Sequence, residues 1–240
     1  MRVVVSKDFS ELSVFIGQIP GLMEDGGGEM VYEGRNRVVR FRHAGRSLIV
    51  KRYKKPLLVQ RFAYTFFRKS KAERAFLFAE EFLRRGIDTP APVAFVECSV
   101  GGLLSMCYFV SVESEGVETS QLLREVADYP GELAEAVAKQ VLEMHRRGVL
   151  HGDLNLSNFL CTACPEGYHF TMIDTNRSRF CQGMPTDKQC MENMIRLTHR
   201  RDLYEDLIRR YARRRGWDEE QVATKALRLL HNFEHRRFKL

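Results

Sequence analysis

One short polar stretch constrains this chain of 240 residues more than any other feature. Residues 151–158 read His-Gly-Asp-Leu-Asn-Leu-Ser-Asn, and Asp174 follows sixteen residues after Asn158. A carboxylate in such a stretch can accept the proton of an attacking hydroxyl, while an amide and a second carboxylate can hold Mg²⁺ on the phosphates of ATP. The order Asp153, Asn158, Asp174 therefore indicates the chemistry of phosphoryl transfer.

We expect the side chains of this stretch to have separate roles. Asp153 is the predicted catalytic base, or the carboxylate that orients the acceptor hydroxyl; an Asp that only caps a loop is the structural alternative. His151 is expected to brace the loop and the Asp174 segment by hydrogen bonding. Asn158 and Asp174 are the predicted Mg²⁺ ligands, because Mg²⁺ prefers oxygen ligands and keeps several waters.

The cation expected to bind the nucleotide phosphates is Lys51. It follows the apolar residues 48–50, as a lysine does when it emerges from a strand toward bound phosphates. Three nearby basic residues are competitors for the role: Arg52, Lys54 and Lys55.

Two further residues are expected to take part in nucleotide binding. Glu73 is the predicted partner of the phosphate-binding lysine on the following helix, with Glu80 and Glu81 as alternatives. Gly34 lies in a turn that would cover the phosphates, although this turn has one glycine where protein kinases have three.

The periodicity of the first half predicts an antiparallel sheet and one helix. Strands are expected at 29–33, 38–42, 47–53, 93–98 and 103–112, since short β-rich runs alternate with Gly- and Asn-containing turns. A helix is expected from about Ser70 to Arg85, where Ala72, Phe76, Ala79 and Leu83 form one apolar stripe.

The second half is predicted to be mainly helical. Apolar stripes at helical spacing run from Leu133 to Met144 and from Leu203 to Tyr211, and a hairpin turning at 164–167 leads to Asp174. The fold class is therefore α+β, with the two-lobe outline of the protein-kinase-like fold. We expect residues 1–114 to form a nucleotide-binding lobe and 115–240 a helical catalytic lobe, together one kinase-like domain.

The charge of the chain favours anionic partners. Lys and Arg number 38 against 31 Asp and Glu, and much of the excess lies at 51–71 and in the last forty-five residues. Such a bias suits nucleic acid, anionic lipid or a phosphorylated glycan, or it is a solvated basic face. Of these partners, nucleic acid is not the one expected for this chain. No stretch approaches the roughly 18 apolar residues of a membrane span, and the apolar run after Met1 is too short for a secretory signal, so a cytoplasmic protein is expected.

The six cysteines suggest one competing site. Cys161 and Cys164 form a C-x-x-C pair, with Cys181 and Cys190 further on, and zinc binding is conceivable. The second pair has wide, irregular spacing, so free thiols are the better interpretation.

Four runs resemble the lipopolysaccharide kinases of Gram-negative bacteria, the Kdo and heptose kinases of the protein-kinase-like fold. These runs are 49–52 (Ile-Val-Lys-Arg), 85–92 (Arg-Gly-Ile-Asp-Thr-Pro-Ala-Pro), 151–158, and 173–177 (Ile-Asp-Thr-Asn-Arg). The resemblance covers roughly Glu29 to Phe180. The chain departs from ordinary protein kinases, because Asp174 is not followed by Phe-Gly and no Ala-Pro-Glu-like element follows.

The resemblance implies a function. It makes Asp153 the catalytic base, Lys51 the nucleotide lysine, and Asn158 and Asp174 the ligands of Mg²⁺ in an ATP-dependent kinase. The implied acceptor is a sugar hydroxyl of the anionic lipid A–core glycolipid, at the inner face of the cytoplasmic membrane. A small serine/threonine protein kinase is one alternative, and a pseudokinase that binds nucleotide without turnover is another.

The C-terminal helices carry the second basic region. Five arginines, at 209, 210, 213, 214 and 215, surround Tyr211, and the basic run 235–240 ends the chain. A basic helical face can lie on anionic lipid, so peripheral contact with the membrane through these helices is expected. A solvated helix is the alternative.

Overall fold

A computed structural model describes residues 1–238 of the chain, with side chains through residue 236. The chain divides into two compact units. The first unit comprises Met1–Arg84 and Thr89–Ser114, and the second comprises Arg85–Asp88 together with the chain from Glu115 onward. The basic run expected to contact lipid at the C-terminus extends beyond the described residues, which exclude Lys239 and Leu240.

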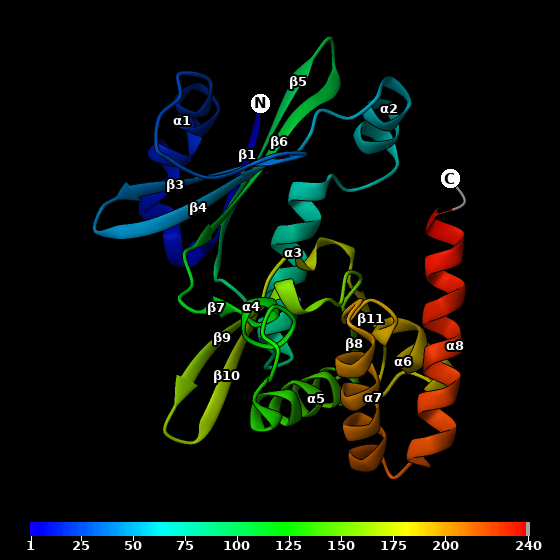
Figure 1. Cartoon of the computed structure of the whole chain (residues 1–240). Helices are drawn as coiled ribbons and strands as arrows, with labels where there is room; N and C mark the ends of the chain where they lie inside the picture. Colours follow the sequence, from blue (N-terminus) through cyan, green and yellow to red (C-terminus); the bar gives the residue numbers. More distant parts are fainter. Residues whose placement is uncertain (239–240) are drawn as a thin grey trace. The chain divides into compact units, whose positions relative to one another are not determined.

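A six-stranded antiparallel sheet in the order β1-β5-β6-β4-β3-β2 forms the first unit (Figure 1). Its strands are β1 (Arg2–Val5), β2 (Glu29–Glu33), β3 (Arg37–His43), β4 (Arg46–Arg52), β5 (Pro92–Val100) and β6 (Leu103–Val112). The five strands expected from the sequence are confirmed within one or two residues. Strand β1 was not expected from the sequence, because its four residues are too few to show a periodic pattern. Its extended conformation is stabilised by pairing with β5.

Both faces of this sheet are covered by helices. On β5, Ala94 and Val96 pack in the cluster that contains helix α1 (Ser13–Glu24), whereas Phe95 packs in the cluster that contains helix α3 (Lys71–Arg84). Side chains alternate between the two faces of a strand, so α1 and α3 lie on opposite faces.

The expectation of a single helix in the first half is wrong. Besides α3, the unit contains α1 and a shorter helix, α2 (Leu58–Phe66). The stretch that forms α1 includes Gly17, Pro20 and Gly21, which all lower helix propensity. Burial of an apolar face on the sheet compensates for this, since most helical stability in proteins comes from tertiary packing.

The second unit is mainly helical, as predicted. Its helices are α4 (Thr119–Leu123), α5 (Gly131–Arg146), α6 (Asp187–Met194), α7 (Arg201–Arg215) and α8 (Glu219–Phe238). Helix α7 packs between α5 and α8. The expected stripes on α5 and α7 are buried, with Leu133, Val137, Leu203 and Tyr211 each at most 1% exposed.

Short strands connect these helices. They are β7 (Val117–Glu118), β8 (Val149–Leu150), β9 (Phe159–Cys164), β10 (Gly167–Met172) and β11 (Arg179–Phe180). Strands β9 and β10 form the predicted hairpin, in which Cys164 lies opposite Gly167. The six cysteines are free. Within residues 1–238, the helices are all too short or too polar to cross a lipid bilayer.

Candidate active site

The polar stretch 151–158 lies in the second unit, directly after β8. Strand β8 pairs with β11, which follows Asp174 by only a few residues, so the chain returns beside the loop that it left. Strand pairing thereby brings together the two segments whose spacing singled them out in the sequence. The turn 175–177 between them is a short 3₁₀ helix.

His151 is fully buried and joins these two segments. Its Nε2 lies 2.9 Å from the carbonyl oxygen of Ile173, and its Nδ1 accepts a hydrogen bond of 3.2 Å from the backbone N–H of Asp153. These contacts require a neutral ring with its proton on Nε2, and burial lowers the pKa of His151 in the same direction. The imidazole therefore holds the loop against the segment that carries Asp174.

Asp153 presents its carboxylate next to two arginines. Arg196 Nη1 lies 3.1 Å from one carboxylate oxygen, and Arg177 Nη1 lies 4.0 Å from the other. The side chain of Asp153 remains 27% exposed, so a hydroxyl compound has access to it. The backbone carbonyl of Asp153 accepts a hydrogen bond of 2.7 Å from Asn158 Nδ2, which joins the two ends of the loop.

Asn158 and Asp174 are held to each other through the backbone. The N–H of Ile173 donates to the carbonyl of Asn158 at 3.0 Å. Because the Nδ2 of Asn158 is used as a donor to Asp153, its amide oxygen is the atom that can coordinate a cation. Asp174 has a left-handed backbone (φ 59°, ψ 45°), and one of its carboxylate oxygens accepts from Asn176 at 2.6 Å. An amide oxygen and a carboxylate on adjoining segments are hard oxygen donors, and this set fits Mg²⁺.

Gly152 explains why the loop reads His-Gly-Asp. A Cβ atom at this position would overlap the backbone carbonyl and the side chain of Arg177. Glycine is therefore required for the close approach of the segment that follows Asp174. The requirement was not visible in the sequence, because the contact joins residues far apart in the chain.

A chain of hydrogen bonds anchors the loop to three helices, and sequence reasoning missed it. Asn193 on α6 donates to the carbonyl of His151 at 2.7 Å and accepts from His145 on α5 at 3.1 Å. His145 in turn bonds Tyr211 on α7 at 2.8 Å. His145 and Tyr211 are almost completely buried, and burial lowers the pKa of His145 to about 4, so its ring is neutral. With this ring neutral, each hydrogen bond between Asn193, His145 and Tyr211 joins one donor to one acceptor.

A small basic pocket adjoins the loop. Its volume is about 220 Å³, and it is lined by His151 and Gly152 of the loop and by residues of the neighbouring segments. Three arginines line it: Arg177, Arg179 and Arg196. Two of these are the arginines beside the Asp153 carboxylate, so an anionic group could bind within reach of that carboxylate.

The run 85–92, one of the four that carried the resemblance, contributes to the second unit through Arg85–Asp88. The carbonyl of Asp88 accepts a hydrogen bond of 2.8 Å from the N–H of Met172, and Ile87 is buried. The segment thus supports the end of β10, immediately before Asp174. The role of Arg85–Asp88 that the structure shows is therefore packing next to the loop.

The three predicted nucleotide-binding residues lie in the first unit. Lys51 is on β4, paired with Val38 and Phe109, and its Nζ lies 5.6 Å from the centre of the Tyr53 ring. Gly34 begins the turn between β2 and β3, where a Cβ would collide with the side chain of Tyr32.

Glu73 lies on α3 and forms an ion pair with Arg2 of β1, at 3.5 Å. The alternative residue Glu81 pairs with Arg84 at 2.6 Å. For Glu80, burial raises the pKa of the carboxyl. The pairing of one of these carboxylates with Lys51 stays a prediction.

The comparisons with known proteins agree with one another. The sequence model described as "Lipopolysaccharide kinase (Kdo/WaaP) family" matches residues 26–224, more than half of the chain. Many solved structures match the fold, among them one described as "WaaP in complex with acyl carrier protein". That structure is 21% identical, with a TM-score of 0.62, over 100% of this chain and 99% of the other. At this identity the structural likeness shows the fold alone. In a separate comparison, no curated protein matches the sequence significantly.

Proposed function

Because the chain belongs to the lipopolysaccharide kinase (Kdo/WaaP) family and is therefore a kinase, we propose that it transfers the γ-phosphate of ATP to a sugar hydroxyl of the lipid A–core glycolipid. The observation that carries the proposal is the braced loop of the second unit, in which Asp153 lies beside Arg196 and a basic pocket. We propose that the reaction takes place on the cytoplasmic side of the membrane, where ATP is available.

Asp153 is the proposed base. It accepts the proton of the acceptor hydroxyl while the hydroxyl oxygen forms a bond to the γ-phosphorus, and the bond to the leaving ADP oxygen breaks. Arg196 and Arg177 lie on either side of the carboxylate and limit its rotation. The neutral His151 fixes the peptide N–H of Asp153, so the carboxylate is presented with little freedom.

Asn158 and Asp174 are the proposed ligands of Mg²⁺. When bound, the ion would neutralise charge on the nucleotide phosphates. The Asn158 amide is oriented for this role by its donation to the Asp153 carbonyl, which ties the metal site and the base to one loop. Lys51, Glu73 and Gly34 keep their proposed roles in nucleotide binding in the first unit.

The basic pocket supports an anionic acceptor. Arginine presents a planar set of donors that matches carboxylate or phosphate groups, and three arginines line about 220 Å³ next to the loop. We propose that the pocket binds an anionic group of the acceptor sugar region and so orients the hydroxyl toward Asp153. A cationic acceptor would meet unfavourable charge there.

The test is phosphate transfer from labelled ATP, with Mg²⁺, to purified lipid A–core glycolipid and to generic protein substrates. The glycolipid is expected to be labelled, and Asp153→Ala should lower turnover by about 10² or more while nucleotide binding changes little. Asp174→Ala should instead weaken the binding of Mg²⁺-ATP. Glu166→Gln, which removes an exposed charge in the β9–β10 turn, should behave as wild type.

The other outcomes discriminate between the alternatives. Label on protein alone would favour a small serine/threonine protein kinase. Nucleotide binding without label on any acceptor would favour a pseudokinase. Wild-type turnover in both Asp153→Ala and Asp174→Ala would overturn the assignment of the site.

A further inference from the structure

Helix α2 is amphipathic, but its polar side faces the protein. Arg61 donates from Nε to the carbonyl of Leu104 at 2.8 Å, and the hydroxyl of Thr65 accepts from the N–H of Leu104 at 2.9 Å. These bonds fasten the polar side of α2 to the start of β6 (Figure 1). The apolar side of the helix must therefore face away from the sheet, the reverse of the usual arrangement on a globular protein.

The apolar side of α2 is strongly exposed. Five residues on it and just after it have exposed fractions between 53% and 82%: Leu58, Val59, Phe62, Phe66 and Phe67. The ring of Phe62 lies 4.8 Å from that of Phe66 and 5.8 Å from that of Phe67, so the three rings form one cluster. A contiguous exposed apolar patch of this kind on a protein surface marks a site that binds another protein, a ligand or a membrane.

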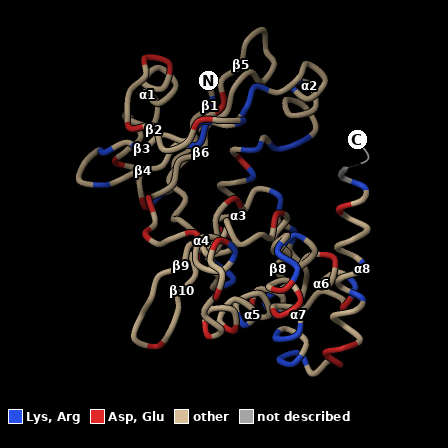
Figure 2. Tube along the Cα trace, in the orientation of Figure 1, with Lys and Arg blue, Asp and Glu red and all other residues tan. Residues whose placement is uncertain are grey.

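Cations flank this apolar face on both sides. Residues 51–71 contain eight Lys and Arg and no Asp or Glu. Lys54 and Lys55 precede α2, Arg68 and Lys69 follow it, and all four are exposed. Figure 2 shows the blue of Lys and Arg in the chain on both sides of α2. Among the side chains that the structure describes, none forms an ion pair with these four. Their charge is therefore available to an anionic partner.

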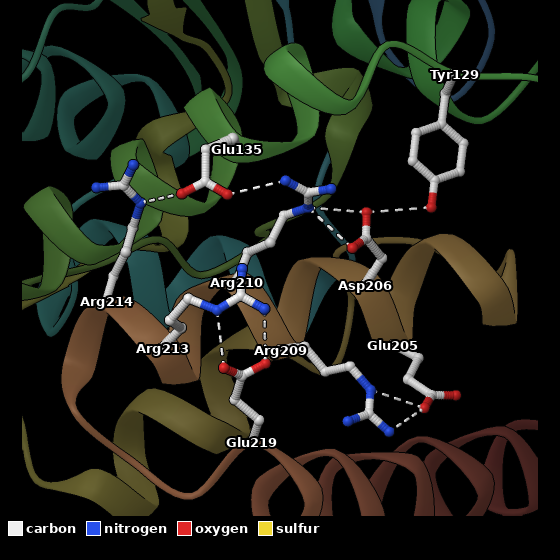
Figure 3. Close-up of polar contacts among 9 residues, drawn as sticks. All are labelled: Tyr129, Glu135, Glu205, Asp206, Arg209, Arg210, Arg213, Arg214 and Glu219. Atoms are coloured by element: carbon white, nitrogen blue, oxygen red, sulfur yellow. Dashed lines mark hydrogen bonds and ion pairs between the residues drawn. The ribbon is translucent and has the colours of Figure 1, made fainter.

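The C-terminal arginines, expected from the sequence to contact lipid, have a different environment. Arg210 and Arg214 both bind Glu135 of α5, and Arg213 binds Glu219 of α8 (Figure 3). Arg209 binds Glu205 and Glu220. Most of the positive charge of α7 is thus neutralised within the protein. The four described cations that flank α2, by contrast, have no such carboxylate partners.

We propose that residues 54–69, here called the α2 face, bind the surface of a membrane that contains anionic phospholipid. The phenylalanines and the aliphatic residues would enter the headgroup region, and the flanking cations would contact lipid phosphates. Apolar side chains on one side of a short helix with basic residues at its ends are what such interfacial binding requires. The choice of a membrane as the partner rests on the proposed function, since a kinase of a lipid-anchored acceptor must work at a bilayer surface.

The test is co-sedimentation of the full chain with vesicles, without nucleotide or acceptor. Vesicles of phosphatidylethanolamine with phosphatidylglycerol are compared with vesicles of phosphatidylcholine at low and high salt. We expect binding to the anionic vesicles that falls with salt. Both Phe62→Ser/Phe66→Ser/Phe67→Ser and Lys54→Gln/Lys55→Gln/Arg68→Gln/Lys69→Gln should weaken partitioning by at least about tenfold. The matched control is Arg213→Gln, an exposed arginine of α7, which should bind as wild type.

Two results would overturn the proposal. One is wild-type partitioning in both α2-face variants. The other is absence of vesicle binding together with stoichiometric binding of a purified acidic protein that both variants lose, which would make the α2 face a protein interface.

Failure of the proposed function is distinguishable from failure of this inference. Phosphate transfer to detergent-solubilised glycolipid should be unchanged in Phe62→Ser/Phe66→Ser/Phe67→Ser, because these three phenylalanines lie outside the residues assigned to catalysis or nucleotide binding. Salt-sensitive vesicle binding through the α2 face without any glycolipid kinase activity would refute the proposed function and leave the membrane surface standing.

Discussion

At the scale of single residues, the loop around Asp153 depends on neighbouring residues that hold its backbone in place. His151 supplies one donor and one acceptor to backbone groups on two segments, which only a neutral, buried imidazole can do. Gly152 contributes by lacking a side chain, since the backbone of Arg177 occupies the space next to its Cα. Arg177 in turn lies near the Asp153 carboxylate, so the fit at Gly152 affects the proposed base directly.

A methyl group at this position tests the argument. Gly152→Ala should displace the 175–177 turn and lower turnover roughly tenfold to a hundredfold, because small misplacements of catalytic groups are costly. Overpacking should also lower the free energy of unfolding by about 1–3 kcal/mol. Kinetics and denaturant titration measure the two effects.

The control for Gly152→Ala is Gly21→Ala in α1. A Cβ at Gly21 would meet no atom within 4 Å, and alanine favours helix. Its turnover should equal that of wild type, and its stability should not fall. Wild-type turnover in Gly152→Ala would show that the close contact with Arg177 is dispensable.

At the scale of elements, ion pairs join the helices of the second unit. Glu135 on α5 receives Arg210 and Arg214 from α7, and Arg213 of α7 reaches Glu219 at the start of α8 (Figure 3). Arg209 of α7 pairs with Glu220 of α8. Burial alone would raise the pKa of Glu135, but hydrogen bonds from the two arginines outweigh it and lower the pKa. A helix that is strongly basic in sequence therefore serves as a connector between two neighbours.

Neutralising Glu135 should loosen the packing of α5 and α7. We expect Glu135→Gln to lower the free energy of unfolding by about 1 kcal/mol. The effect is modest because the ion pairs of Glu135 are only partly buried, and it is unfavourable because the substitution leaves Arg210 and Arg214 close together without their carboxylate. Denaturant titrations of Glu135→Gln, Arg214→Gln and the double variant would give the coupling energy. Additive effects of the two substitutions would mean that the ion pair contributes nothing net.

At the scale of the whole molecule, each unit has a core of its own, and the second contains buried neutral histidine. His145 connects the loop, through Asn193, to α7, through Tyr211, so its protonation state concerns three helices at once. Burial lowers its pKa to about 4 in the folded state, against about 6.5 when it is exposed on unfolding.

This difference predicts a loss of stability in acid. The unfolded chain takes up a proton at His145 below about pH 6.5, whereas the folded chain does so only near pH 4. The contribution of His145 to the free energy of unfolding is therefore fully present above pH 6.5. It falls by roughly 3 kcal/mol as the pH drops to 4. Denaturant titration across this range should show a smaller dependence of the free energy of unfolding on pH for His145→Gln than for wild type. An unchanged slope in His145→Gln would contradict the burial argument.

Much of the local structure could be predicted because its signals are local. Strands β2 to β6, helix α3 and the β9–β10 hairpin follow from alternation, helical spacing and turn residues within a few positions. Helices α1 and α2 could not be found in this way. The first contains Gly and Pro and is stabilised by the sheet beneath it, and the second points its apolar side away from the protein. The two-lobe arrangement of the chain stays a prediction.

The sequence by itself determined the class of chemistry and the family. The signal is local, because the spacing of Asp153, Asn158 and Asp174 along the chain is set by one loop and one hairpin. The tertiary structure alone decided what surrounds them. Asn193 and Arg196 reach the loop from α6 and the turn after it, and the C-terminal arginines find carboxylates on other helices. Such contacts join residues tens of positions apart, and a pattern of neighbours along the chain does not encode which distant carboxylate or carbonyl a side chain will meet. For the same reason the described cations of the α2 face stay without carboxylate partners, although the sequence alone made the C-terminal helices look equally suited.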